Sequence, residues 1–310
     1  MSAASHAEIP RQHRVLCLGE ALVDLICEHE TEDLADADAF VPHFGGVVAN
    51  VAVVAARAGA RVALAGAAGE DAWGRWLRAR LGAEGVDLSW FTLTPNRQTG
   101  VALVSVVPGG EPHYNVLGDT GDTIARALGG DLERVVGESA ALFIGSNTLV
   151  EQSERAATMR ARELALELGR PVVFDPNLRL HRWRSEADAT ASANACVPGA
   201  LLVRATATEA AAMTGEEDPE RAALALVKAG ARLVVITLGA GGAILRGELR
   251  AAAPAATVPV RSTIGAGDVL TGFLLARLAL TGFYPAAVAA ALPEAVARAG
   301  HACQRWGALD

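Results

Sequence analysis

The residues best suited to chemistry lie at 262–268, where the sequence STIGAGD runs directly into an apolar helical pattern at 269–280. Glycine has no Cβ atom, so a Gly-Ala-Gly segment lets a ligand approach the backbone closely. The amino end of the helix that follows offers unpaired N–H donors and a partial positive charge. These features suit an anionic phosphate, and donors fixed in place can stabilise a phosphoryl group during transfer.

Asp268 closes this stretch and gives it a second function. A carboxylate is unexpected at a site that only binds anions, because its charge repels the ligand. It fits if Asp268 accepts a proton from an attacking hydroxyl, as a base does in phosphoryl transfer. The alternative is a glycine-rich loop in which Asp268 only caps the helix. The stretch alone leaves both interpretations open.

The elements that must position this stretch follow an α/β pattern. Short apolar runs alternate with longer helical patterns, which predicts a mostly parallel sheet with helices on both faces. The expected strands are 15–18, 62–65, 142–144, 172–174, 201–203 and 233–238, and the expected helices are 48–57, 72–81, 151–168, 219–229 and 266–280. Ligands bind such sheets at the carboxyl ends of the strands, so the chemistry is expected there.

Two segments, 22–44 and 95–118, break this alternation. The second contains an alternating strand pattern at 99–107 that ends at the turn 108–110 (PGG). We interpret both segments as a small β structure that projects over the edge of the sheet. Two ordinary surface loops are the alternative. Residues 1–13 are expected to be a mobile tail.

The composition narrows the possible partners. The chain has 310 residues and a net charge of −8, and its basic residues are scattered, which argues against nucleic-acid binding. No apolar run approaches the roughly 18–20 residues of a membrane-spanning helix, and the amino-terminal residues lack a signal-peptide pattern. The four cysteines are widely spaced without a CxxC pair, so reduced thiols and a cytoplasmic location are expected. Lys228 is the only lysine, which excludes a P-loop.

The GAGD sequence at 265–268 resembles the second signature of the PfkB, or ribokinase-like, carbohydrate kinases. Companion motifs occur in that family's order: GEALVD at 19–24, GGVVAN at 45–50, GEDAWG at 69–74, DPNLR at 175–179 and TLGAGG at 237–242. The resemblance covers about residues 14–308. It implies a ribokinase-like three-layer α/β/α sandwich with a mostly parallel central sheet. Residues 14–310 would form one kinase domain, with a small β lid built from segments at about 22–44 and 95–118.

The resemblance also implies an active site for ATP-dependent phosphorylation of a sugar. Asp268 would be the catalytic base, and an anion hole would be formed by Gly265, Ala266 and Gly267. The implied sugar-binding residues are Asp24, Gly45, Gly46, Asn50 and Arg179. Polar groups in a partly closed site discriminate between hydroxyl positions, because an unmatched polar group is costly. The guanidinium of Arg179 would face the sugar or the transferred phosphoryl.

The nucleotide side of the implied site departs from the family pattern. Thr237, Gly239 and Gly242 would contact ATP. The family's NxxE element is TATE at 206–209 here, so Glu209 would support Mg²⁺ through water. Ser262 replaces an aspartate that helps hold potassium in many relatives. Loss of that charge predicts little dependence on K⁺.

DPNLR followed by Trp183 and FIGSN at 143–147 resemble the fructokinase and 2-keto-3-deoxygluconate kinase branches of the family. GEPHYNVLG at 110–118 resembles a bacterial fructokinase pattern, so the resemblance favours fructose as the acceptor. A 2-keto-3-deoxygluconate kinase is the second reading, because Arg179 could bind a sugar acid's carboxylate. A catalytically weak sugar- or nucleotide-binding regulator is an alternative of another class. A nicotinamide dehydrogenase is disfavoured, because the glycines at 239–242 are not followed by a helix. A homodimer formed through the lid is also implied.

Overall fold

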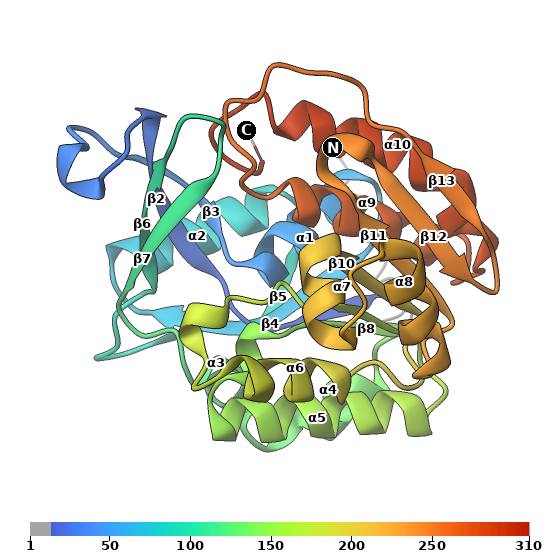
Figure 1. Ribbon diagram of the computed structural model, residues 1–310. Coiled ribbons are helices and arrows are strands. Elements are labelled where there is room, and N and C mark those ends of the chain that lie inside the picture. The colour runs from blue at the N-terminus through green and yellow to red at the C-terminus, as the bar shows by residue number, and fades with distance from the viewer. Residues whose placement is uncertain (1–13, 310) are drawn as a thin grey trace, which may run out of the picture.

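The computed structural model describes residues 14–309, and within these residues a nine-stranded sheet forms the centre of the molecule (Figure 1). From one edge to the other, its strands are β13 (Ala251–Ala253), β12 (Ala243–Gly247), β11 (Leu233–Thr237), β10 (Leu202–Thr206), β9 (Val172–Asp175), β8 (Ala141–Gly145), β1 (Val15–Leu18), β4 (Val62–Gly69) and β5 (Asp87–Thr94). The strands from β11 to β5 pair in parallel, and β12 and β13 are antiparallel. This order confirms the predicted parallel sheet.

Helices cover both faces of the large sheet, which gives the three layers that the resemblance implies. One face carries α1 (Val47–Arg57), α2 (Ala72–Ala83), α9 (Ala266–Leu280) and α10 (Ala286–Ala302). The other carries α3 (Thr123–Leu128), α4 (Leu132–Gly137), α5 (Gln152–Glu167), α6 (Glu186–Asn194), α7 (Ala207–Thr214) and α8 (Pro219–Lys228). Strand β1 shows the reason: Val15 and Cys17 enter one core, whereas Leu16 and Leu18 enter the other. Strands buried on both faces are therefore uniformly apolar.

A second, four-stranded sheet projects beside the first (Figure 1). Its order is β3 (Val41–Gly45), β2 (Leu22–Glu30), β6 (Val101–Val106) and β7 (Pro112–Leu117). The pair β2–β6 is parallel, and the two outer pairs are antiparallel. These strands fall within or beside the two segments that broke the α/β alternation, and the strand expected at 99–107 is β6. The expected tail at residues 1–13 lies outside the described residues.

The small sheet rests on the loop that carries the GAGD sequence. Ile26 and Val104 pack with Ile264 and with Trp306 near the carboxyl end of the described chain. The backbone N–H of Thr263 also donates to the carbonyl of Gly110, with an N···O distance of 2.8 Å. The turn between β6 and β7 is therefore fixed directly to the loop before α9.

Helices α1 and α9 pack closely against each other, and their amino ends meet. The contact depends on Gly272, because a Cβ atom there would lie 2.6 Å from Cβ of Val54 and 2.8 Å from the carbonyl oxygen of Val51. A side chain at this position would force the two helices apart. The first turns of the two helices are thus held together. Among residues 14–309, no helix is both long and apolar enough to cross a membrane.

Several elements were not predicted. The sequence analysis assigned no element to α10, which contains Pro293, and it also missed the antiparallel edge strands β12 and β13. Proline interrupts helical hydrogen bonding, and β13 is only three residues long, so neither element gives a strong local pattern. Packing against neighbours determines these elements: Val288 and Leu292 of α10 are fully buried in the core, and β12 and β13 pair at one edge of the large sheet.

Candidate active site

A cavity of about 340 Å³ lies where the carboxyl ends of the central strands meet the small sheet. Its lining comes from segments far apart in the sequence, including Asp24 on β2, Asn50 on α1, Arg204 on β10 and Asp268 on α9. The site therefore lies at the strand ends, where ligands bind in parallel α/β sheets.

Asp268 lies in the first turn of α9, and only 5% of its surface is exposed. The Nδ2 atom of Asn50 donates a hydrogen bond to Oδ2 of Asp268 at 2.8 Å, across 218 residues of sequence. The GGVVAN and GAGD motifs therefore meet at these side chains. No hydrogen bond from the Asp268 side chain caps α9, because its N-cap residue is Gly265. The interpretation of Asp268 as a plain helix cap is therefore disfavoured.

Burial raises the pKa of Asp268 above its ordinary value, because the charged form loses hydration. The Asn50 amide and the guanidinium groups of Arg204 and Arg179 oppose this shift. The result is a buried carboxylate whose negative form is supported by fixed hydrogen-bond and charge partners. A proton acceptor needs these properties.

The loop before Asp268 shows why glycine is required there. Gly265 has φ of +68°, in the left-handed region that favours glycine, and a Cβ atom would lie 2.0 Å from Cβ of Ala308. At Gly267 a Cβ atom would lie 2.5 Å from a terminal nitrogen of Arg204. Gly265 and Gly267 line the cavity, whereas Ala266 is not among the lining residues.

Within the part of the chain that the structure describes, Asn50 Oδ1 is buried without a hydrogen-bond partner. A buried unpaired acceptor is costly, so a site that keeps one is suited to a ligand that donates a hydrogen bond. A sugar hydroxyl is such a donor.

Asp24 lies opposite His43 in the register of β2 and β3, and both side chains are buried. Burial raises the pKa of Asp24 to about 7, the charge of Asp268 adds to the shift, and the Arg179 and His43 charges oppose it. Gly45 lies directly behind the carboxylate, since a Cβ atom there would be 2.4 Å from Asp24 Oδ1. Gly45 therefore makes room for Asp24, and it is Gly46 that lines the cavity.

Arg179 and Tyr114 both line the cavity and contact each other. The guanidinium carbon of Arg179 lies 4.8 Å from the centre of the Tyr114 ring, within the range of a cation–π contact. Tyr114 belongs to β7 of the small sheet, whereas Arg179 follows β9 of the large one. This contact therefore joins the two sheets over the site.

The structure brings Arg204 into the site, a residue that the sequence analysis did not single out. Arg204 is 4% exposed, and its guanidinium lies between Asp175, at 3.4 Å, and the Thr237 hydroxyl, which accepts a hydrogen bond at 3.0 Å. Its Nε atom is buried without a partner among the described residues. The signal was present in the sequence, because an arginine inside the apolar run LLVRAT needs a buried counter-charge.

Asp175 forms a buried ion pair with Arg204. It is fully buried, and Thr271 of α9 donates a hydrogen bond to its Oδ2 atom at 2.7 Å. Burial raises the pKa of Asp175, and the charge of Arg204 opposes this. The pair links the ends of β9 and β10 with helix α9.

Glu209 lines the cavity but is also a structural anchor. Its Oε2 atom accepts from the N–H and the hydroxyl of Thr206, forming a capping box for α7. Its Oε1 atom accepts from the N–H of Leu178 at 2.8 Å, which fixes the DPNLR segment. The residue predicted to support Mg²⁺ therefore also shapes the backbone around the cavity.

The predicted ATP contacts lie one strand further along the sheet and do not line the cavity. Thr237 ends β11 and joins the site through Arg204. Gly239 and Gly242 flank an exposed turn, with φ of +56° and +91°. A Cβ atom at Gly242 would lie 2.0 Å from the carbonyl oxygen of Ala253.

Comparison with known protein families matches residues 12–308 to the pfkB family carbohydrate kinase. This chain belongs to that family. Among curated proteins, it is 31% identical over 271 residues to Fructokinase-1 of Oryza sativa subsp. japonica, covering 86% of this chain and 84% of the rice protein. It is 30% identical over 280 residues to Probable fructokinase-4 of Arabidopsis thaliana, covering 89% and 84%.

Solved structures of related pfkB proteins have the same fold. The fructokinase of Vibrio cholerae O395, solved with fructose, ADP and calcium, superposes with a TM-score of 0.80 at 27% identity, covering 96% of this chain and 95% of that one. The aminoimidazole riboside kinase of Salmonella enterica, solved with its riboside and an ATP analogue, gives a TM-score of 0.79 at 26% identity, with coverage of 96% and 95%. The chain is therefore a carbohydrate kinase with a ribokinase-like fold, as predicted.

The raised pKa of Asp24 predicts a pH-dependent stability. Between the ordinary aspartate pKa of about 3.9 and about 7, the folded protein holds a proton that the unfolded chain has released. Stability is therefore lost as the pH rises through this range. Asp24→Asn cannot ionise, so its free energy of unfolding relative to wild type should improve by about 1–3 kcal/mol between pH 5 and pH 8.

Urea unfolding at the two pH values measures this difference. Glu32→Gln, which changes an exposed carboxylate of the same segment, is the control. If Asp24→Asn has the same effect on unfolding at pH 5 and pH 8, the argument from burial is wrong.

Proposed function

We propose that this kinase transfers the γ-phosphoryl group of ATP to a hydroxyl of fructose, with Asp268 as the base. The observation that carries the proposal is the hydrogen bond between the buried carboxylate of Asp268 and Asn50, at the amino end of α9 inside a cavity. Similarity to plant fructokinases, and to a bacterial fructokinase solved with fructose and ADP, supports fructose as the acceptor.

In the proposed mechanism, Asp24 and the unpaired Oδ1 of Asn50 accept hydrogen bonds from sugar hydroxyls. The reacting hydroxyl lies against Asp268, which removes its proton during attack on the γ-phosphorus. The amino end of α9, where Gly265, Gly267 and Asp268 line the cavity, stabilises the charge on the transferred phosphoryl through its N–H groups and the helix dipole. The N–H of Ala266 donates to the carbonyl of Thr263, so Ala266 contributes to the shape of this loop. The attack is direct, and no phosphorylated enzyme forms.

Two arginines at the cavity can balance the negative charge of the nucleotide phosphates. Arg204 lies against Gly267 of the proposed anion hole, and Arg179 lines the same cavity. Glu209 also faces the cavity, where its carboxylate can orient the water ligands of Mg²⁺. Bound Mg²⁺ neutralises phosphate charge. Thr237, Gly239 and Gly242 are proposed to contact ATP at the neighbouring strand end.

The small sheet is proposed to act as a lid over the sugar. Tyr114 and Asp24 belong to its strands and line the cavity. Its β6–β7 turn accepts a hydrogen bond from the loop that precedes α9. A lid in this position excludes water from the reacting groups, so the phosphoryl group reaches the sugar rather than water.

A 2-keto-3-deoxygluconate kinase is the second candidate, and one feature of the cavity favours it. Arg179, His181 and Arg182 come from one segment and all line the cavity. Their guanidinium and imidazole groups are suited to a carboxylate of a sugar acid. A coupled assay of ADP release with fructose, 2-keto-3-deoxygluconate, ribose and nucleosides distinguishes the two candidates.

The proposed base is tested with Asp268→Asn. Loss of a positioned base should lower kcat on the best acceptor by about 10²–10⁴-fold, and ATP binding measured by calorimetry should be largely retained. Asp131→Asn, which changes an exposed aspartate outside the cavity, is the matched control. A kcat within a few-fold of wild type would contradict the assigned role, and no turnover of any acceptor by the wild type would favour a binding regulator.

The proposed role of Arg204 predicts a change in the pH profile. Its charge lowers the pKa of Asp268, so removing it should move the acid limb of kcat/KM to higher pH as well as reduce kcat. Because a lone buried charge would destabilise the protein, the test uses Arg204→Met combined with Asp175→Asn. The wild type is the control, because Asp175→Asn alone would leave the buried Arg204 charge without its carboxylate. An acid limb at the same pH in the double variant and the control would exclude this role.

The position of Ser262 supports low dependence on potassium. Its side chain is buried, and its hydroxyl oxygen accepts a hydrogen bond from the N–H of Ile264 at 3.1 Å. The neutral serine supplies no anionic ligand to a monovalent cation. We expect the rate to change less than about tenfold when K⁺ replaces Na⁺ at equal ionic strength, and a larger activation would show that other groups bind the ion.

We further propose a homodimer formed through the lid. Leu117 on β7 is 50% exposed and Val41 on β3 is 39% exposed, and these strands are the two edges of the small sheet. Exposed apolar side chains on open strand edges are features of association surfaces. Sedimentation equilibrium of the wild type and of Leu117→Glu tests this, and a monomeric wild type at micromolar concentration would contradict it.

A further inference from the structure

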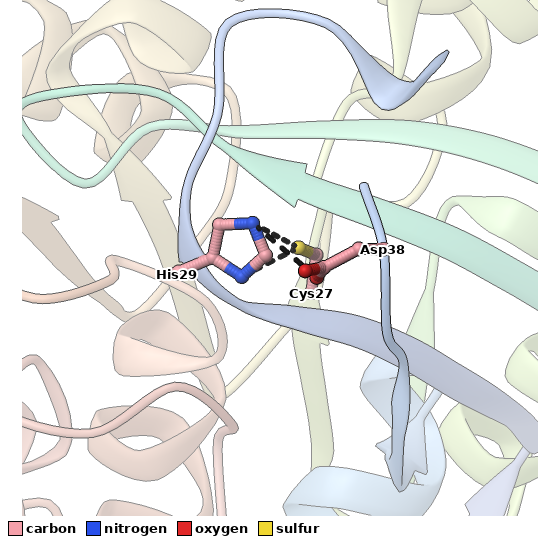
Figure 2. Close-up of side chains that lie close together, drawn as sticks. All are labelled: Cys27, His29 and Asp38. Carbon is pink, nitrogen blue, oxygen red and sulfur yellow. Dashed lines mark hydrogen bonds and ion pairs between the residues drawn. The ribbon is translucent and has the colours of Figure 1, made fainter. Parts of the chain in front are cut away.

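Three side chains that can coordinate a metal ion lie close together in and beside the small sheet, and none of them lines the cavity. Figure 2 shows Cys27 and His29 on β2 beside Asp38, which lies in the connection to β3. Their ligand atoms all lie within 4.8 Å of one another. Neither the proposed kinase reaction nor the family resemblance uses these residues.

We propose that Cys27, His29 and Asp38 bind a zinc ion, with water as the fourth ligand. The Nε2 atom of His29 lies 3.4 Å from Cys27 Sγ and 3.7 Å from Asp38 Oδ1. Zinc–ligand distances of about 2.0–2.3 Å in a tetrahedron place sulfur and nitrogen about 3.6 Å apart, and nitrogen and oxygen about 3.4 Å apart. Both separations are therefore near those of a bound site.

The donor set selects zinc over the magnesium that a kinase uses. Thiolate and imidazole are ligands of zinc and other borderline metals, whereas magnesium and calcium take oxygen ligands. One carboxylate completes three protein ligands and leaves an open position for water. The ion would bind at this cluster rather than displace magnesium at the nucleotide.

The surroundings of the cluster also attract cations. Residues 28–38 contain the carboxylates of Glu28, Glu30, Glu32, Asp33, Asp36 and Asp38, and no lysine or arginine occurs between residues 15 and 56. Such a local excess of negative charge raises the local concentration of cations. The acidic segment thus supplies attraction, and the cysteine and histidine supply selectivity.

An ion can reach the cluster from solvent. Cys27 is buried, but the side chains of His29 and Asp38 are 48% and 82% exposed. Sγ lies at similar distances from both ring nitrogens, 3.3 and 3.4 Å, so the ring must turn to direct one nitrogen at the ion. Its exposure permits that rotation. Coordination replaces the thiol proton of Cys27 by zinc and releases that proton to solvent.

Zinc binding would fix the acidic connection between β2 and β3 against strand β2. Asp38 is separated from Cys27 by the short 3₁₀ helix η2 (Leu34–Asp36), and a shared ion would close this segment into a loop. The inference is independent of the proposed sugar and of Asp268. Its test therefore needs no kinase assay.

The test is titration of the full chain with Zn²⁺ against a chromophoric chelator, with saturating Mg²⁺ to occupy hard-cation sites. One equivalent should bind and raise Tm. His29→Ala and Asp38→Asn change exposed side chains, and each should weaken binding by more than about tenfold, since loss of even an outer-shell partner costs 10- to 100-fold. Substitution with Co²⁺ should give thiolate-to-metal absorption in the near ultraviolet, which Cys27→Ser should abolish.

Two control variants make the result specific. Asp36→Asn removes an acid of the same segment outside the cluster, and Cys303→Ser removes a thiol elsewhere; both should bind Zn²⁺ as the wild type does. Binding that persists unchanged in His29→Ala and Asp38→Asn overturns the proposal. So does the absence of stoichiometric binding in the wild type, which would leave His29 and Asp38 as a surface ion pair beside a thiol.

Discussion

The hydrogen bond between Asn50 and Asp268 is the contact on which the organisation of the site depends. It joins the first turns of two helices that are separated by 218 residues of sequence. Close packing of α1 against α9 at Gly272 brings these turns together. The bond leaves the amide oxygen of Asn50 unpaired in a residue that lines the cavity. One contact therefore positions the proposed base and leaves a hydrogen-bond acceptor beside it.

Buried charge is the second constraint. Asp24, Asp175 and Asp268 are all nearly inaccessible, and burial raises the pKa of each. Arg204 opposes the shifts of Asp175 and Asp268, and Arg179 opposes those of Asp24 and Asp268. Because each unpaired buried charge is costly, the carboxylates and guanidinium groups depend on one another. The site is therefore a single electrostatic unit rather than a set of independent side chains.

The small sheet connects this unit to the rest of the molecule. It supplies Asp24 and Tyr114 to the cavity, packs Ile26 on Ile264, and bonds its turn to the loop before α9. The same sheet presents exposed strand edges and the Cys27, His29 and Asp38 cluster on its other parts. The proposed substrate contacts, association surface and metal site thus involve different residues of one sheet.

The sequence by itself determined the features that depend on near neighbours. Apolar runs predicted the parallel strands, glycine spacing marked the loop at 265–267, and the order of motifs indicated the family. Tertiary structure alone decided which side chains meet. Arg204 reaches Asp175 and Thr237 across 29 and 33 residues, and Gly45 is required by the carboxylate of Asp24 on the neighbouring strand. Such contacts leave no local pattern, because pairing and packing between distant segments set them.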